Sequence, residues 1–543
     1  MIIRLMQSSP RVGDILGNTR LIYQAMQQAS GTDVDMLVFP ELMITGYPPE
    51  DLLLRQSFLN EVDQGIGAIV QSSGEAVVVF GAPRQEAGKL YNSVFMAQHG
   101  RLLGIYDKQE LPNYGVFDER RYFTAGQGLQ SVFKLKGVNV GIGICEDLWS
   151  DTLAETQAGL DCDVWLNLNA SPFHINKQHE REALTSRRAR QFGCPVVYVN
   201  PVGGQDEVVF DGGSHVVNAQ GEVVFRLPLF ADVEVGKADI NIHDLSGLGL
   251  AEIPEDMAQM YQALVLGTKD YVLRNGCSQV VLGLSGGIDS ALTAAIAVDA
   301  LGKENVLGVL LPSIFSSEHS LKDAQDLVDN LGMESITLPI ADSVQAIEST
   351  LADTFAAWGK TEPDVTEENI QARVRGVLLM AISNKTGRML LTTGNKSEMA
   401  VGYATLYGDM AGGFAVLKDV YKTQVFALCE WLNREREIIP QHTIMKPPSA
   451  ELRPEQKDSD SLPDYAILDA ILQASIEERL SIQDIAELGY DKQEVERVVR
   501  MIHRAEYKRR QAPPGVKITE RAFGRDRRYP ITHGFRDNWF TTS

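Results

Sequence analysis

The sequence predicts an α/β protein with two domains, and three observations support that fold class. Short apolar runs of strand length recur through the chain, and in its second half they alternate with segments of helical composition. The chain has 543 residues, more than one hydrophobic core usually serves. We expect domains at residues 1–243 and 261–543, joined by a linker rich in Gly, Pro and acidic residues at 244–260.

The first half contains apolar runs that are each followed by polar residues. Runs of this kind are typical of strands that are buried in a layered α/β domain. They lie at 36–39, 76–80, 138–144, 164–168 and 195–199.

The second half begins with a helical segment near Met260. Three strands are expected after it, at 280–284, 306–311 and 389–393. Because these strands alternate with helices, the sequence predicts a parallel sheet.

Composition excludes several classes of function. Aspartate and glutamate outnumber lysine and arginine by 72 to 50, which gives a net charge of −22 and argues against non-specific nucleic-acid or membrane binding, since either needs a basic face. The five cysteines are scattered without C-x-x-C spacing, which argues against a disulfide framework or a zinc site. No run approaches the ~18 apolar residues of a spanning helix, and the first residues lack a signal-peptide core. We therefore expect a cytoplasmic protein that acts on small molecules.

A glycine turn follows the run at 280–284 and precedes a segment of helical composition. It contains Ser285, Gly286, Gly287, Asp289 and Ser290. The glycines let the backbone approach an anion closely, the two serines supply hydroxyl donors, and a helix N-terminus adds partial positive charge. The turn therefore predicts a phosphate site, although a plain turn between a strand and a helix is the alternative.

This turn lacks the lysine that a Walker-type loop places on the β- and γ-phosphates. Its S-G-G-x-D-S pattern instead resembles the loop of the ATP pyrophosphatases. That resemblance implies that the loop holds pyrophosphate as the leaving group while an acceptor attacks the α-phosphate. The expected products are AMP and pyrophosphate, and ATP is the expected cosubstrate.

Three reactive side chains, Glu41, Lys108 and Cys145, lie at or just beyond apolar segments of the first half. A thiol is mostly protonated at neutral pH, so its attack on an amide needs a carboxylate to take the proton and a cation nearby. The oxyanion that follows needs donors, for which Lys108 and backbone amides near Cys145 are available. Taken singly, each of the three has a structural alternative, because such a cysteine is often only packed and such a charge is usually solvated.

In their contexts, F-P-E, K-x-x-L-P-N-Y and G-x-x-I-C-E-D-L-W, these residues resemble the glutaminase domain of the nitrilase superfamily. The resemblance implies an α-β-β-α sandwich in which Cys145 is the nucleophile, Glu41 the general base and Lys108 the oxyanion stabiliser. It also implies a glutamine pocket with Tyr114, Ser171 and Lys177 as contacts and Tyr47 as a further candidate. Aromatic packing is the alternative for the tyrosines, and Glu119 is expected to brace Lys108.

The second half carries a further carboxylate, Glu398, at the start of a predicted helix after the strand at 389–393. Beside phosphates such a carboxylate is unfavourable unless a cation lies between, so we expect Asp289 and Glu398 to share Mg²⁺. The alternative for both residues is an interaction that caps a helix.

The stretch from Leu391 to Asp409, L-T-T-G-N-K-S-E-M-A-V-G-Y-A-T-L-Y-G-D, resembles the NAD synthetase domain. The resemblance implies a doubly wound parallel sheet of the adenine nucleotide alpha hydrolase kind, and it also implies a homo-oligomer. Asp289 would belong to the ATP site, together with the serines and glycines of the turn and with Thr393. Residues implied to contact nicotinic acid adenine dinucleotide are Asp409, Lys422 and Lys508.

One segment departs from the family pattern. Gln456 begins Q-K-D-S-D-S-L-P, where the resemblance leads us to expect Q-x-D-E-D-S-L-P. This departure leaves Asp458 and Asp460 without an assigned role.

Together the two resemblances imply a ligase that amidates nicotinic acid adenine dinucleotide, using ATP, Mg²⁺ and ammonia released from glutamine. Two alternatives stay open at this point. One is another glutamine-fed adenylating ligase, such as a GMP synthetase, and the other is an amidase whose second domain only senses a nucleotide.

Overall fold

Two units make up the chain in this computed structural model, Met1–Asp256 and Met257–Ser543. The structure describes residues 1–127, 131–231, 236–454, 456–535 and 537. The division after Asp256 falls inside the expected linker at 244–260, and the expected domain bounds stay a prediction. None of the helices within the described ranges is long and apolar enough to cross a membrane.

The first unit is built on two six-stranded sheets. In order across the first sheet, its strands are β14 (Lys237–Asn241), β1 (Ile2–Met6), β2 (Met36–Val38), β3 (Val77–Glu86), β4 (Lys89–Gln98) and β5 (Arg101–Asp107). In order across the second sheet, they are β13 (Val223–Arg226), β12 (His215–Val217), β9 (Val196–Val199), β8 (Val164–Leu168), β7 (Val138–Ile144) and β6 (Val132–Leu135). A separate hairpin joins β10 (Val202–Gln205) and β11 (Val208–Asp211).

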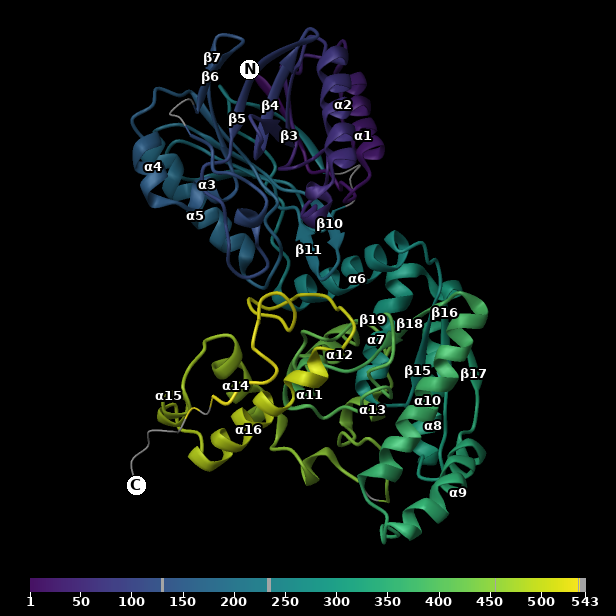
Figure 1. The fold of residues 1–543 in the computed structure, drawn as a ribbon. Helices are drawn as coiled ribbons and strands as arrows, with labels where there is room; N and C mark the ends of the chain where they lie inside the picture. The colour runs from purple at the N-terminus through teal and green to yellow at the C-terminus, as the bar shows by residue number, and fades with distance from the viewer. Residues whose placement is uncertain (128–130, 232–235, 455, 536, 538–543) are drawn as a thin grey trace. The chain divides into compact units, whose positions relative to one another are not determined.

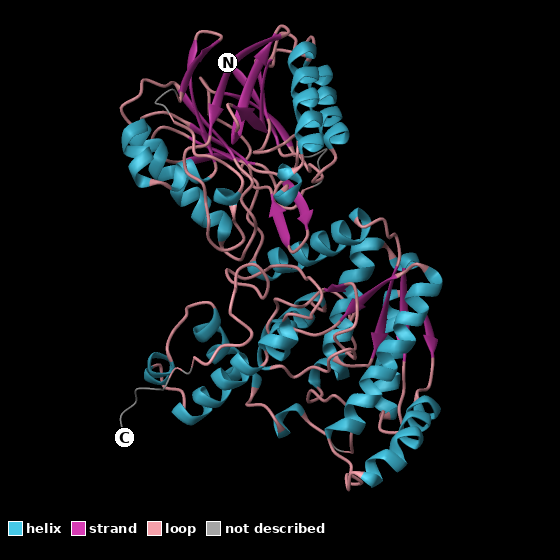
Figure 2. Ribbon diagram, viewed as in Figure 1, coloured by secondary structure: helices cyan, strands magenta, loops and turns pink. Residues whose placement is uncertain are grey.

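The two sheets pack face to face and each carries helices on its outer face (Figure 2). The helices on the first sheet are α1 (Ile15–Ala29) and α2 (Gln56–Ser72), and those on the second are α3 (Glu146–Trp149), α4 (Asp151–Gln157) and α5 (Lys177–Phe192). The expected α-β-β-α sandwich is confirmed.

Strand β2 illustrates why the apolar runs predicted buried strands. Met36 and Val38 face the core between the two sheets, whereas Leu37 faces the core beneath α1 and α2. All three side chains are 0% exposed, so neither face of the strand selects polar residues. The strand therefore appears in the sequence as a continuous apolar run.

The second unit contains a five-stranded sheet whose neighbouring strands are all parallel. Across this sheet the order is β17 (Glu334–Thr337), β16 (Val306–Leu310), β15 (Val280–Leu284), β18 (Met389–Thr392) and β19 (Phe414–Ala415). The predicted parallel sheet is confirmed. Because the chain leaves β15 for β16 on one side and later returns to β18 on the other, the strand order reverses at β15. In sheets of this kind, ligands bind beyond the carboxyl ends of the strands at such a point.

Helices surround this sheet (Figure 1). Those that precede residue 446 are α6 (Asp256–Arg274), α7 (Ile288–Leu301), α8 (Glu318–Leu331), α9 (Ala341–Ala357), α10 (Val365–Thr386), α11 (Lys396–Val401), α12 (Lys422–Leu432) and α13 (Gln441–Met445). Both α7 and α10 pack against β15. A separate apolar cluster joins α11 to a helical segment made of α14 (Tyr465–Ile476), α15 (Ile482–Glu487), α16 (Lys492–Arg504) and α17 (Glu506–Arg509).

Candidate active sites

The three expected catalytic residues of the first unit are all buried, and each follows a strand. Lys108 directly follows β5, Cys145 directly follows β7, and Glu41 lies in the turn after β2. The Nζ atom of Lys108 donates to Oε1 of Glu41 at 2.7 Å. Both charged groups also act electrostatically on the Cys145 thiol. The structure therefore brings the predicted nucleophile, base and cation together.

Cys145 occupies a constrained turn between β7 and α3. Its φ angle is 42°, a left-handed value that is uncommon for a residue other than glycine. The Cys145 amide donates to the Leu168 carbonyl at 2.9 Å, which ties the turn to the neighbouring strand β8. The Ile144 amide donates to Oδ2 of Asp147 at 2.9 Å, and Asp147 also accepts the amides of Gln109 and Glu110 beyond Lys108. The Asp147 carboxylate thus links the nucleophile turn to the lysine loop.

Further buried groups surround Lys108, and none of them was predicted to be catalytic. Lys108 Nζ also donates to Oε1 of Glu119 at 2.8 Å, and the Tyr47 hydroxyl donates to the same oxygen at 2.8 Å. The Nδ2 atom of Asn92 donates to Oε1 of Glu41 at 2.7 Å. The second carboxylate oxygen of Glu41, Oε2, is buried and has no hydrogen-bond partner within the described ranges. One base oxygen is therefore held in place and the other is open for a proton.

The charges of this site are set by burial and by the neighbours. Burial raises the pKa of Glu41 to about 7, against the opposing attraction of Lys108. Burial also raises the pKa of the Cys145 thiol well above its usual range, with Glu41 adding to the effect. Burial disfavours the Lys108 ammonium, but Glu119 and Glu41 outweigh it and hold its pKa above the ordinary value. The thiol is thus neutral at rest beside a carboxylate that can change charge near neutral pH.

The three expected glutamine contacts have different surroundings. The Tyr114 side chain is 58% exposed, and its hydroxyl donates to Oε2 of Glu146 at 2.9 Å. Ser171 is buried, and its hydroxyl accepts from Nε of Arg181 at 3.1 Å. Lys177 lies at the start of α5, where Nζ pairs with Glu180 at 2.8 Å. Tyr114 and Lys177 both act electrostatically on Glu146, so these two side chains share one neighbour.

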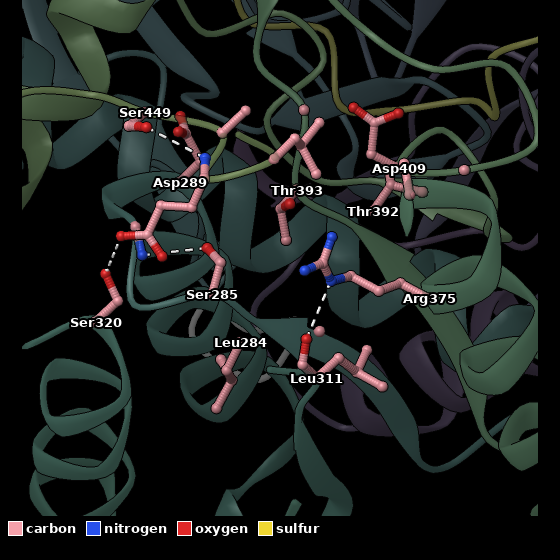
Figure 3. A pocket seen from close by; sticks show the side chains of 18 of the residues that line it. Leu284, Ser285, Asp289, Leu311, Ser320, Arg375, Thr392, Thr393, Asp409 and Ser449 are labelled. Carbon is pink, nitrogen blue, oxygen red and sulfur yellow. Dashed lines mark hydrogen bonds between the residues drawn. The ribbon is translucent and has the colours of Figure 1, made fainter. Parts of the chain in front are cut away.

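The second unit contains a cavity of about 320 Å³ beyond the carboxyl end of β15. Figure 3 shows the side chains of Ser285, Thr393 and Arg375 directed toward this pocket. The predicted residues that line it are Ser285, Gly287, Asp289, Thr393, Glu398, Asp409 and Lys422. The structure therefore gathers most of the ATP, metal and dinucleotide residues that the sequence predicts around one pocket.

The glycine turn fits closely against the start of α8. Gly286 has a φ of +74°, and a Cβ there would lie 2.1 Å from the Ser320 carbonyl oxygen. The Gly287 amide donates to the Ser285 hydroxyl at 3.1 Å, and the Ser290 hydroxyl donates to the Gly287 carbonyl at 2.9 Å. Gly286 and Ser290 thus shape the turn, while Ser285 and Gly287 line the pocket.

The two expected metal ligands, Asp289 and Glu398, share a lysine in this structure. Lys422 Nζ bonds to Oδ2 of Asp289 and lies 3.4 Å from Oε1 of Glu398. Asn395 supports the pair, because its Nδ2 donates to Oδ1 of Asp289 at 2.9 Å and its Oδ1 accepts the Glu398 amide at 3.0 Å. Lys422 was expected to contact the dinucleotide, and here its ammonium contacts the two acids.

These acids have the chemistry that Mg²⁺ requires, since two carboxylates from different helices point at one position. Burial raises the pKa of Glu398 to about 8, against Lys422 and with help from Asp289 and Asp458. A group of three or more His, Cys, Asp or Glu side chains fit to hold a metal is absent among the residues described. A magnesium ion there would therefore need further oxygens, such as those of phosphates.

The remaining expected dinucleotide contacts differ from each other. Asp409 lines the pocket with an exposed side chain and accepts the Thr405 amide at 2.6 Å. Lys508 donates to the carbonyl oxygens of Gly402 and Ala404 at 2.8 and 2.7 Å, which occupies its ammonium within the protein. Its positive charge still acts on Asp409.

Two basic pocket residues were absent from the sequence-based set. Arg375 lies on α10 and donates through Nε to the Leu311 carbonyl at 3.1 Å, with the guanidinium facing the pocket (Figure 3). Lys446 bonds to the Ser320 hydroxyl at 3.0 Å and to Asp323 at 3.1 Å. A single cation on a helix or loop is usually solvated, so no sequence signal separates these two from other basic residues.

Comparison with known proteins covers both units. The family model described as carbon-nitrogen hydrolase matches residues 2–248, and the one described as NAD synthase matches residues 260–512. The chain is 45% identical to the glutamine-dependent NAD(+) synthetase of Thermotoga maritima, over 98% of this chain and 99% of that protein. It is 46% identical to the protein of that name from Acinetobacter baylyi, over 98% of each.

A solved structure gives a similar result. The glutamine-dependent NAD+ synthetase from Acinetobacter baumannii, in complex with adenosine diphosphate, is 44% identical to this chain. The alignment covers 99% of each chain with a TM-score of 0.79. The whole chain, including both candidate sites, is therefore similar to one kind of two-domain protein.

Proposed function

Because the chain belongs to the glutamine-dependent NAD(+) synthetase family, we propose that its two sites divide the work of one amidation. The enzyme is a carbon-nitrogen ligase with glutamine as amido donor. It converts nicotinic acid adenine dinucleotide to NAD, with ATP split to AMP and pyrophosphate and glutamine hydrolysed to glutamate. The single observation that carries this proposal is the match to proteins of this activity over 98% of the chain, which spans both sites.

The first unit releases ammonia. The Cys145 sulfur attacks the glutamine amide carbon, and the open Oε2 of Glu41 takes the thiol proton. Two bonds of Lys108 go to Glu41 and Glu119, which leaves its third N–H for the oxyanion. Glu41 then returns the proton to the departing nitrogen, and water hydrolyses the thioester. Tyr114, Ser171 and Lys177 are proposed to hold the glutamine.

The second unit activates the carboxylate, because a free carboxylate is a poor electrophile. The turn formed by Ser285, Gly286, Gly287 and Ser290 holds the pyrophosphate, with Ser285 and Gly287 at the pocket wall. The nicotinate carboxylate attacks the α-phosphorus. Thr393 lies near the adenylate, while Asp409 and Lys508 belong to the proposed dinucleotide site. Ammonia then attacks the acyl-adenylate and AMP leaves. Cytoplasmic location and a homo-oligomeric assembly belong to the proposal as well, supported by five unpaired cysteines and by the family resemblance.

Magnesium is proposed to bind at Asp289 and Glu398. The ion would neutralise part of the triphosphate charge and orient the α-phosphorus. Lys422 compensates the two acids in this structure, since its pKa is raised by Asp289 and Glu398 against the cost of burial. Once the acids are compensated otherwise, the Lys422 ammonium is released to pair with phosphate oxygens.

A product assay tests the proposal. Purified enzyme with glutamine, Mg·ATP and nicotinic acid adenine dinucleotide should give NAD, AMP, pyrophosphate and glutamate in equal amounts. ADP with orthophosphate, or no NAD, would refute it. Turnover of xanthylate in place of the dinucleotide would identify a GMP synthetase, and glutamine hydrolysis without pyrophosphate release would identify an amidase with a nucleotide sensor.

A further inference from the structure

Asp458 is a buried carboxylate in the wall of the ATP pocket that no step so far uses. It begins the short 3-10 helix Asp458–Asp460, lines the pocket with Glu398 and Lys422, and is 5% exposed. Its amide donates to the Pro448 carbonyl at 3.1 Å, which fixes the turn that carries it. The fold therefore holds this carboxylate in a defined position in the pocket wall.

Only one oxygen of Asp458 is satisfied. The Tyr465 hydroxyl donates to Oδ2 at 2.9 Å, whereas Oδ1 is buried and lacks a hydrogen-bond partner among the residues that the structure covers. A buried carboxylate oxygen without a donor is costly, so such atoms in native proteins ordinarily meet a ligand or take part in chemistry. Its position in the pocket wall points to a donor that arrives with the reaction.

The groups that face Asp458 carry excess negative charge. Asp289 and Glu398 act on it as like charges and Lys422 as an opposing cation, while the Tyr403 and Tyr465 hydroxyls lie against it. The three acids do not form a ready metal cluster within the described residues. The unpartnered oxygen of Asp458 is an acceptor that suits an N–H donor.

We propose that Asp458 is the catalytic base of the second half-reaction, the group that takes a proton from ammonia as it attacks the acyl-adenylate. The proposal rests on the proposed function. The ammonia nitrogen forms a bond to the acyl carbon, and one N–H proton passes to Oδ1 of Asp458. The carbon–oxygen bond to AMP then breaks, and AMP leaves with the bonding electron pair. Ammonia, acyl-adenylate and the carboxylate thus give the amide, AMP and protonated Asp458, which releases its proton to solvent.

The electrostatics of the site agree with that role. Burial raises the pKa of Asp458 above its ordinary value, against the attraction of Lys422. A carboxylate with a raised pKa is a stronger base than an exposed aspartate, and a nearby cation favours its ionised form. Tyr465 orients this base through Oδ2 without blocking Oδ1.

The test separates the two half-reactions in the full-length enzyme. Asp458→Asn should keep the dinucleotide-dependent exchange of labelled pyrophosphate into ATP within about twofold of wild type, since adenylation does not use the base. Formation of NAD from ammonium should fall by about 10²–10⁴-fold, the usual contribution of a general base. Hydroxylamine should restore much of the lost rate, because its adduct loses a proton more readily than that of ammonia.

Asp460→Asn is the matched control, because Asp460 lies in the same turn but its partly exposed side chain pairs with Arg453. It should retain both activities. Tyr465→Phe keeps the carboxylate but removes its orienting bond, so it should slow NAD formation less than Asp458→Asn and leave exchange intact. If Asp458→Asn fails to fold, this second variant still decides the proposal.

Three outcomes would overturn it. Loss of exchange together with NAD formation in a folded variant would place Asp458 in ATP binding. Full ammonium-driven activity in the Asp458→Asn variant would show that Asp458 has no catalytic role. An equal loss of NAD formation in Asp460→Asn would show that the turn itself, and not the Asp458 carboxylate, is required. Failure of the proposed function itself is distinguishable, because wild-type enzyme would then show no dinucleotide-dependent exchange.

Discussion

Each unit holds a buried lysine between two carboxylates, but the surroundings of the two lysines differ. Lys108 is enclosed with Glu41 and Glu119, whose side chains are 1% and 5% exposed. Lys422 is buried too, but its partners Asp289 and Glu398 are 18% and 17% exposed and line an open pocket. The same charge pattern is therefore sealed in one unit and accessible to ligands in the other.

One arrangement of charges can therefore serve two kinds of chemistry. In the sealed site, the lysine pairs with two buried acids, one of which, Glu41, is the proposed base for Cys145. In the open site, the lysine compensates acids that a magnesium nucleotide can also reach. We therefore expect variants of the open site to affect every route to NAD, and variants of the sealed site to affect only the use of glutamine.

The largest expected effect is that of Glu398→Gln. Removing one acid of the open site should lower NAD formation by about 10²–10³-fold with glutamine and with ammonium alike, since adenylation precedes both. Steady-state NAD formation with each nitrogen source measures this. Glu430→Gln, at an exposed position on α12, is the control and should be unaffected. A loss confined to glutamine would contradict the separation of the sites.

The pH dependence of glutamine hydrolysis sharpens the comparison at the sealed site. Glu41 must be ionised to accept the thiol proton, and burial raises its pKa to about 7. The value of kcat/KM for glutamine should therefore be maximal above that pH and should fall as the pH drops through about 7.

Glu119→Gln is the companion variant for this profile. The negative charge of Glu119 contributes to the raised pKa of Glu41, so its removal should move the inflection to lower pH. Profiles of the wild type and the variant, each checked for folding by thermal unfolding, provide the measurement. An inflection that stays in place or moves to higher pH would show that Glu41 does not control the step.

The smallest expected effect is at the rim of the sealed site. The Tyr114 side chain is 58% exposed, and the Tyr114→Phe variant removes its hydroxyl, which bonds to Glu146. A hydrogen bond of this kind contributes about 0.5–1.5 kcal/mol, so KM for glutamine should rise up to about tenfold. The value of kcat should change little, because Tyr114 contacts no reacting atom. A fall in kcat at unchanged KM would instead place the tyrosine in the chemistry.

Several of the strands that the sequence predicted are buried on both faces. Strands β2, β7, β8 and β15 lie between packed layers, so their residues form continuous apolar runs. Strand β5 was missed because Arg101, Leu102 and Leu103 are exposed there. Strand β14 was missed because its outward residues are polar and only Ile240 is fully buried. Periodicity alone does not distinguish such edge segments from loops.

The candidate sites were predicted where the chemistry lies within a short stretch. Glu41, Lys108 and Cys145 each stand in a recognisable local context at a strand end. Asn92 could not be found in this way, because it lies on β4 and reaches Glu41 only through the pairing of β4 with its neighbours. The placement of Lys422 between Asp289 and Glu398 likewise depends on three segments that only the fold brings together.

The most direct test of two separate sites is the Cys145→Ala variant, assayed with glutamine and with ammonium as alternative nitrogen sources. Removing the nucleophile should lower glutamine-driven NAD formation by at least about 10⁴-fold. Ammonium-driven formation, with AMP and pyrophosphate released in step, should stay close to that of the wild type. Loss of both activities in a folded variant, or retention of the glutamine-driven one, would contradict the account.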